Sequence, residues 1–125
     1  MSDGIKSYRD LLVWQKSMDL VVASYGIAKK FPPQEMYGLV TQVQRAAVSI
    51  PANIAEGHGR KHRGDYLHHL SIARGSLLEL ETHLLIAGRL GYLLPPEVEN
   101  ILRLTDELGR MVSGLIQKLR SKPAP

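Results

Sequence analysis

The sequence contains no cysteine, few aromatic residues and no long apolar run. The absence of cysteine excludes a disulfide framework and a thiolate metal site, and it fits a reducing compartment, so we expect a cytoplasmic protein. A membrane-spanning helix needs about 18 or more successive apolar residues, which the sequence nowhere provides, and its N-terminus lacks the apolar stretch of a signal peptide. Strict alternation of apolar and polar residues, the pattern of a β-strand, is missing as well.

The sequence does contain enough apolar residues for one modest core. Its 125 residues are 44% apolar, which is typical of a single folded domain spanning residues 1–125 and argues against disorder. The net charge is +4, and the isoelectric point lies near 9.5. A basic chain of this kind permits a nucleic-acid partner without requiring one.

Apolar residues recur at helical spacing in four segments joined by short links. This pattern predicts an all-α protein, an antiparallel up-down-up-down four-helix bundle. Ser7 and Asp10 resemble a capping box at the start of the first helix, and prolines or glycines separate the segments. The expected helices cover about residues 8–30, 34–56, 65–90 and 97–119.

Pro51 lies in the middle of the second expected helix, where it removes one helical hydrogen bond and crowds the preceding turn. Since such a proline costs about 3 kcal/mol or more in an ordinary helix, we expect a kink that the protein uses. Polar residues share one narrow arc of this helix: Gln42, Arg45, Ser49, Asn53 and Glu56. Ser49 has no histidine partner at a recognisable spacing, so we favour a hydrogen-bonded network or a polar subunit contact over catalysis. Arg45 would then pair with Glu56, or with Glu81 of the third helix or of a neighbouring subunit.

Helix four has a single apolar face, whereas helices one and three are apolar on more than one side. The expected core face of helix one comprises Leu11, Trp14, Met18, Val21, Val22 and Tyr25. A second seam, spaced by sevens on its far side, comprises Val13, Leu20 and Ile27. The apolar arc of helix three is widened by Leu67, Leu78 and Leu85, with Arg74 and Glu81 inside it. The alternative is scattered surface leucines, but we expect both seams to form the contact between subunits of a homo-oligomer.

Several short segments occur in an order that resembles the four-helix-bundle proteins related to those encoded by 23S rRNA intervening sequences. Between about Tyr8 and Leu94 they are Val13-Trp14-Gln15-Lys16, Phe31-Pro32 with Glu35, Tyr37-Gly38-Leu39, Gln42, Arg45-Ala46-Ala47, Ser49-Ile50, Asn53-Ile54-Ala55-Glu56-Gly57, Ile72-Ala73, Gly75-Ser76, Glu79-Leu80-Glu81 and Leu90-Gly91-Tyr92-Leu93. The resemblance implies a homo-oligomer, typically a pentameric ring, without established enzymatic activity. The chain is also similar to the accessory protein of diversity-generating retroelements, a basic pentamer that works with a reverse transcriptase and nucleic acid.

The strongest basic cluster is the link after the second helix. Its Arg60, Lys61 and Arg63 can contact phosphate oxygens, and neighbouring glycines let a backbone approach. Arg45 is a further candidate through the family resemblance, although Gln44 stands where a second arginine is common. The alternative for the link is a solvated turn whose charges aid solubility, because no aromatic residue is interleaved as a stacking platform.

The sequence suggests no other chemistry. The histidines lack the spacing of a metal site, and no nucleophile is recognisable beside a base. We therefore expect no metal, cofactor, small-molecule substrate or enzymatic activity. Two functions remain: an oligomeric bundle that binds RNA or DNA through basic residues, and a protein–protein scaffold without a nucleic-acid role.

Overall fold

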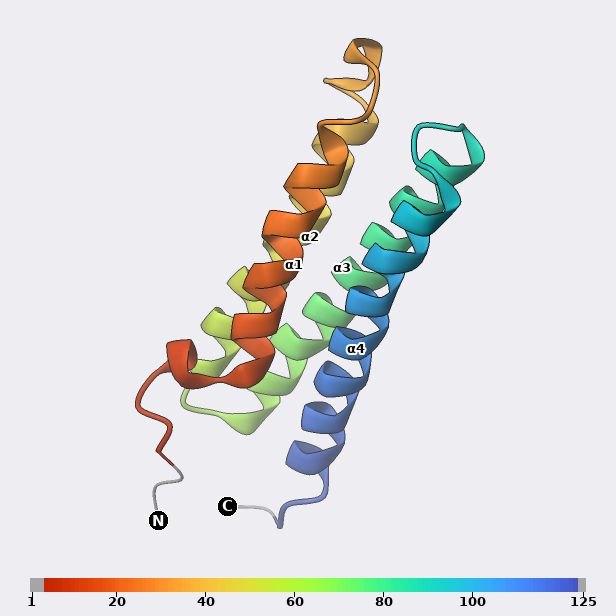
Figure 1. Cartoon of the computed structure of the whole chain (residues 1–125). Coiled ribbons are helices and arrows are strands. Elements are labelled where there is room, and N and C mark those ends of the chain that lie inside the picture. Colours follow the sequence, from red (N-terminus) through yellow and green to blue (C-terminus); the bar gives the residue numbers. More distant parts are fainter. Residues whose placement is uncertain (1–3, 124–125) are drawn as a thin grey trace.

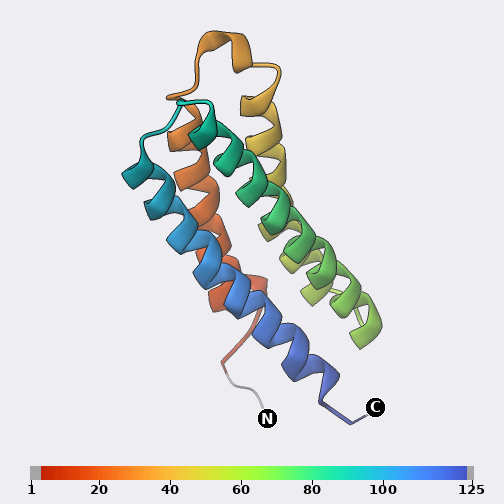
Figure 2. The same ribbon diagram turned by 90° about the vertical axis from the view of Figure 1, so that its right-hand side faces the viewer.

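The computed structural model describes residues 4–123, and all regular structure in this part of the chain is helical. The long helices are α1 (Leu12–Ala28), α2 (Leu39–His58), α3 (Arg63–Arg89) and α4 (Pro95–Arg120), with short 3₁₀ turns at η1 (Tyr8–Asp10) and η2 (Pro33–Glu35). They run up and down in turn (Figure 1), and Figure 2 shows the same bundle from the side. Each helix packs against the next, and α4 closes the bundle against α1. The prediction of an all-α four-helix bundle is confirmed.

The first helix begins later than the sequence predicts, because the backbone at Leu11 is extended, with φ −73° and ψ 125°. Ser7 and Asp10 do form a capping box, but it caps the short turn η1. The Ser7 hydroxyl accepts from a backbone N–H of that turn at 3.2 Å, and the Asp10 carboxylate accepts from the Ser7 N–H at 3.2 Å. The predicted helix over residues 8–30 is therefore divided into η1 and α1.

Glu35 joins two connections at the opposite end of the bundle. One of its carboxylate oxygens accepts from the Leu39 N–H at 3.2 Å and so satisfies a free donor at the start of α2. The other accepts from the Tyr92 hydroxyl at 2.8 Å, in the link between α3 and α4. The Tyr92 ring also packs against Phe31 with centroids 5.8 Å apart, and the link turns at Gly91, whose φ of +80° suits glycine.

The core face of α1 differs from the predicted one. Val13 and Leu20 are buried, with 6% and 1% of their surfaces exposed, and Ile27 packs half-buried against the same core. The prediction that these three residues form an outer seam is therefore wrong. Ser17 and Ser24 are fully buried on the same face of α1 as Val13 and Leu20. The core face of this helix therefore includes small polar residues, which an apolar pattern does not identify. Three residues of the predicted core face are instead 40% or more exposed: Met18, Val22 and Tyr25.

The apolar arc of α3 divides between the core and an outer surface beside α4. Leu67 packs half-buried against the core, whereas Leu78 and Leu85 are 59% and 47% exposed. Glu81 lies between these exposed leucines, and its carboxylate accepts a hydrogen bond from Thr105 Oγ1 of α4 at 3.0 Å. Glu81 thus has a partner inside the bundle, and its predicted pairing with Arg45 does not occur within the chain.

The helices α2 and α3 approach each other closely near the end of α2. A methyl group at Gly57 would lie 2.8 Å from the His69 Cβ and 3.0 Å from the Tyr66 ring, so a larger residue requires the helices to shift. Pro51 is buried within α2, and the helix continues beyond it to His58. The kink at Pro51 stays a prediction.

Candidate nucleic-acid interface

Basic residues gather at the end of the bundle where the α2–α3 link, the N-terminal segment and the last turn of α4 lie together (Figure 1). This basic end carries Lys6, Arg9, Arg60, Lys61, Arg63, Lys118, Arg120 and Lys122. The acidic side chains described there are Asp10, Glu56 and Asp65. Because cations outnumber anions, the positive charge of the protein is concentrated at this end, where its potential attracts phosphate groups.

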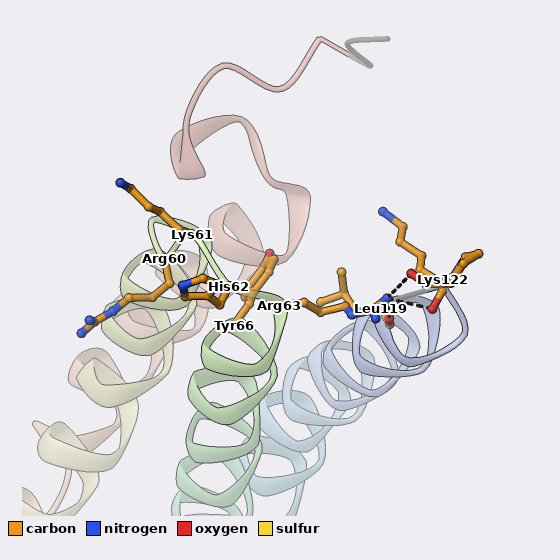
Figure 3. A pocket seen from close by; sticks show the side chains of 8 residues that line it. Arg60, Lys61, His62, Arg63, Tyr66, Leu119 and Lys122 are labelled. Atoms are coloured by element: carbon orange, nitrogen blue, oxygen red, sulfur yellow. Dashed lines mark hydrogen bonds between the residues drawn. The ribbon is translucent and has the colours of Figure 1, made fainter. Parts of the chain in front are cut away.

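Within the basic end, an open groove of about 360 Å³ separates the α2–α3 link from the end of α4. Figure 3 shows its lining residues, which are Arg60, Lys61, His62, Arg63, Tyr66, Leu119, Lys122 and Pro123. Tyr66 brings an aromatic ring beside the cations, and that ring meets His58 edge-on with centroids 5.8 Å apart. Burial raises the pKa of the Tyr66 hydroxyl, which therefore stays neutral at neutral pH. The sequence predicts a basic link with no aromatic residue for base stacking. The fold adds such a residue to the groove, because Tyr66 lies one helical turn beyond the basic run.

Arg63 fastens the end of α4 to the start of α3. Its Nη1 donates to the backbone carbonyls of Leu119 at 3.2 Å, Lys122 at 2.8 Å and Pro123 at 3.1 Å. The last carbonyls of a helix lack partners within the helix and carry partial negative charge, so a guanidinium stabilises them. Arg63 therefore has a structural role in addition to the phosphate contact predicted for it.

The other cations of the groove differ in how they are paired. Arg60 forms an ion pair with Glu56 at 2.7 Å, and its hydrogen bond, followed by the charge of His69, holds the pKa of the Glu56 carboxyl below its ordinary value. Both partners are about half exposed, so the pair adds little to stability. Lys61 and Lys122 are exposed, and their ammonium groups have no ion-pair or hydrogen-bond partner within residues 4–123. These two lysines are the cations most available to a ligand.

Arg45 is not part of the basic end. Fifteen residues separate it from Arg60, which corresponds to about 22 Å along a helix. It lies on the α2–α3 face beside Gln42 and Ser76, in a separate polar depression. Its predicted pairing with Glu56 does not occur, because that carboxylate pairs with Arg60. The structure thus brings Arg60, Lys61 and Arg63 together and leaves Arg45 apart.

The polar arc of α2 faces α3 and forms a chain of hydrogen bonds with it. His69 Nδ1 lies 3.0 Å from Asn53 Oδ1, and His69 Nε2 lies 3.5 Å from the Glu56 carboxylate. The Asn53 amide donates to the Ser49 hydroxyl at 3.1 Å, and that hydroxyl lies 2.8 Å from the Ser76 hydroxyl. The expected hydrogen-bonded network is therefore present. The two α3 members of the network, His69 and Ser76, were not predicted from the sequence. Their spacing of seven residues places both on one face of the helix.

This chain of polar groups is not arranged for nucleophilic catalysis. The Asn53 side chain lies between Ser49 and His69, and an amide cannot accept a proton from the serine as an imidazole would. Within residues 4–123, no three histidine, aspartate or glutamate side chains converge as metal ligands would. Nor does any helix of that stretch combine the length and apolar character needed to cross a membrane.

A four-helix bundle with a cationic end is thus the class of protein that the fold and the groove define. The chain belongs to the family of 23S rRNA-intervening sequence proteins, whose family model matches residues 9–114. Its structure is similar to the crystal structure of a protein of unknown function from the S23 ribosomal protein family of Bacteroides thetaiotaomicron, with a TM-score of 0.79 and 26% sequence identity. That match covers 84% of this chain and 98% of the other. No curated protein matches the sequence. The family resemblance noted in the sequence is confirmed.

Proposed function

We propose that the protein is a non-enzymatic, oligomeric bundle that binds RNA or DNA through backbone phosphates at its basic end. The groove carries this proposal, because its lining combines the unpaired lysines Lys61 and Lys122 with the aromatic ring of Tyr66. Ammonium groups without intramolecular partners are free to contact phosphates, and an aromatic ring offers a stacking surface for an unpaired base. The family name refers to 23S rRNA, which agrees with such a context. The cysteine-free sequence supports a cytoplasmic location.

The test is a salt titration of oligonucleotide binding with the double variant Lys61→Gln, Lys122→Gln. Each phosphate contact that is lost should reduce the slope of log affinity against log salt by about 0.7–0.9, and binding should weaken equally across base sequences. Lys29→Gln is the matched control, because Lys29 is an exposed lysine at the opposite end of the bundle. An unchanged slope in the double variant would contradict the proposal. Absence of binding at low ionic strength would contradict it too and would favour the protein–protein scaffold.

Self-association is the second part of the proposal, and it rests on two exposed apolar surfaces. The surface on the α1–α2 side contains Met18, Val22, Tyr25 and Val48, and the surface on the α3–α4 side contains Leu78 and Leu85. Because the helices pack in cyclic order, these two sides are opposite each other. A contact between different surfaces is heterologous, and repeated around an axis it closes into a ring. The fivefold order of the proposed ring comes from the family resemblance.

Light scattering at micromolar concentration tests this assembly. Val22→Glu and Leu78→Glu each put an unpaired charge into the proposed contact, so each should reduce the mass to that of a monomer. Both side chains are more than half exposed in the bundle, so the helical circular dichroism should be preserved. Leu12→Glu is the control, since Leu12 is 59% exposed and lies one helical turn before Lys16, which pairs with Glu107 of α4. A monomeric mass for the unmodified protein, or an unchanged mass in both variants, would contradict the ring.

A further inference from the structure

A polar depression of about 250 Å³ lies midway along the α2–α3 face. Its lining consists of Gln42, Arg45, Ala46 and Ser49 from α2 and of Ser76 and Glu79 from α3. Arg45 is exposed, and no carboxylate within residues 4–123 pairs with its guanidinium. An unpaired guanidinium beside other hydrogen-bond donors is well suited to an oxyanion, because it can donate two parallel charge-assisted hydrogen bonds.

The hydrogen-bond chain across α2 and α3 ends at the Ser76 hydroxyl, which lies in the lining of the depression. Asn53 is oriented because its Oδ1 faces His69 Nδ1 at 3.0 Å and its Nδ2 donates to the Ser49 carbonyl at 2.9 Å. Nδ2 also donates to Ser49 Oγ at 3.1 Å, and Ser49 Oγ lies 2.8 Å from Ser76 Oγ, where either hydroxyl can be the donor. When Ser49 is the donor of this pair, the Ser76 proton is left for an acceptor in the depression.

The lining contains one acidic side chain, Glu79. Glu79 lies 3.8 Å from His83 Nε2, one turn further along α3. That nitrogen is buried and has no hydrogen-bond partner in the described part of the chain, so the Glu79 carboxylate is the group placed to compensate it. Glu79 keeps its charge in the lining, so the attraction of Arg45 for an anion has to exceed the repulsion from this carboxylate.

We infer that this depression is a phosphate site, in which Arg45 supplies the positive charge and Ser76 and Gln42 supply further donors. A phosphoryl group presents three acceptor oxygens and can satisfy the donors of Arg45, Ser76 and Gln42 together, whereas a carboxylate presents two. The site is about 22 Å along α2 from Arg60 and does not depend on the basic end. Its ligand is a phosphate group, either on a small molecule or in a nucleic-acid backbone.

Titration of the ¹⁵N-labelled protein with sodium phosphate at constant ionic strength tests the inference by nuclear magnetic resonance. Saturable shifts are expected for the backbone amides around Arg45 and Ser76. Arg45→Gln should abolish saturation, and Ser76→Ala should weaken binding about tenfold, as for loss of one hydrogen bond to a charged group. Arg103→Gln is the matched control, because Arg103 is an exposed arginine of α4 whose side chain donates to Asn100 of its own helix. Unsaturable shifts in the unmodified protein, or identical titrations with Arg45→Gln, overturn the inference.

Single-stranded oligonucleotide binding by Arg45→Gln then identifies the source of the phosphate. If this variant loses both phosphate and oligonucleotide affinity, the nucleic-acid backbone occupies the site. If it loses phosphate binding alone, the ligand is a small phosphorylated molecule. Failure of the lysine variants at the basic end would leave the phosphate titration unaffected, so the two proposals fail separately.

Discussion

Separate replacement of Leu20 and Val22 by alanine tests the orientation of α1. Leu20 is 1% exposed and Val22 is 71% exposed, although both lie in the middle of the same helix. Shortening a buried leucine removes apolar contacts and leaves a cavity, which lowers the free energy of unfolding by about 2–5 kcal/mol. Val22 already faces water, so the same replacement there should change that free energy by no more than about 0.5 kcal/mol.

These energies convert into a clear difference in melting temperature. An unfolding entropy of about 2.1 cal mol⁻¹ K⁻¹ per residue corresponds to about 0.26 kcal mol⁻¹ K⁻¹ for a chain of 125 residues. A loss of about 3 kcal/mol in Leu20→Ala should therefore lower Tm by about 11 °C. Val22→Ala should lower Tm by no more than about 2 °C.

Urea and thermal unfolding, followed by circular dichroism, measure both quantities. The measurements need a dilution series, because self-association stabilises the folded chain by mass action and Val22 belongs to a proposed contact. A loss in Val22→Ala that disappears on dilution reports the contact between subunits. Equal destabilisation of the two variants in the most dilute sample would refute the buried position of Leu20 and restore the predicted core face.

Three further variants test other contacts. Arg63→Gln removes the guanidinium that donates to three carbonyls at the end of α4. We expect the free energy of unfolding to fall by about 1–2 kcal/mol and amide exchange in that turn to become faster. Unchanged amide exchange would contradict the capping role of Arg63. Gly57→Ala places a methyl group 2.8 Å from the His69 Cβ, so urea unfolding should show a loss of about 1–3 kcal/mol, and a more stable variant would show that the helices adjust freely. The hydrogen bond from Lys30 holds the pKa of Glu97 below its ordinary value of 4.5, so the stabilisation is present above that pH and is lost as the pH falls through the lowered pKa. Glu97→Gln should therefore flatten the dependence of unfolding free energy on pH as the pH falls below the ordinary glutamate pKa of 4.5, and an identical pH dependence would argue against the pair.

The predictability of each helix depends on how strictly its apolar residues keep to one side. In α4 they do, and Leu108, Val112 and Ile116 are buried as their spacing indicates. In α1 the core contains Ser17, a residue usually assigned to the surface. Its hydroxyl donates to the Trp14 carbonyl at 2.7 Å, which offsets the cost of burying a polar group and lets a serine occupy a core position.

The candidate site also has one part that is contiguous in the sequence and another part that only the fold brings together. The charges of Arg60 and Lys61 are contiguous, so the basic link was predictable from the sequence alone. The groove was not, because Lys122 reaches it only when α4 returns to the α2–α3 link and is fastened there by Arg63. The role of His69 was hidden for the same reason, since its partners belong to a different helix.

The carboxylate of Glu35 has a consequence for how the protein opens. This carboxylate accepts hydrogen bonds from the start of α2 and from the α3–α4 link. When either segment loses its order and displaces Glu35, the other segment loses its hydrogen-bond acceptor. Two stretches far apart in the sequence are thereby joined into one cooperative unit, which should unfold locally in a single step. Thermal motion that separates the helices is then resisted at this end by Glu35 and at the opposite end by the three hydrogen bonds of Arg63.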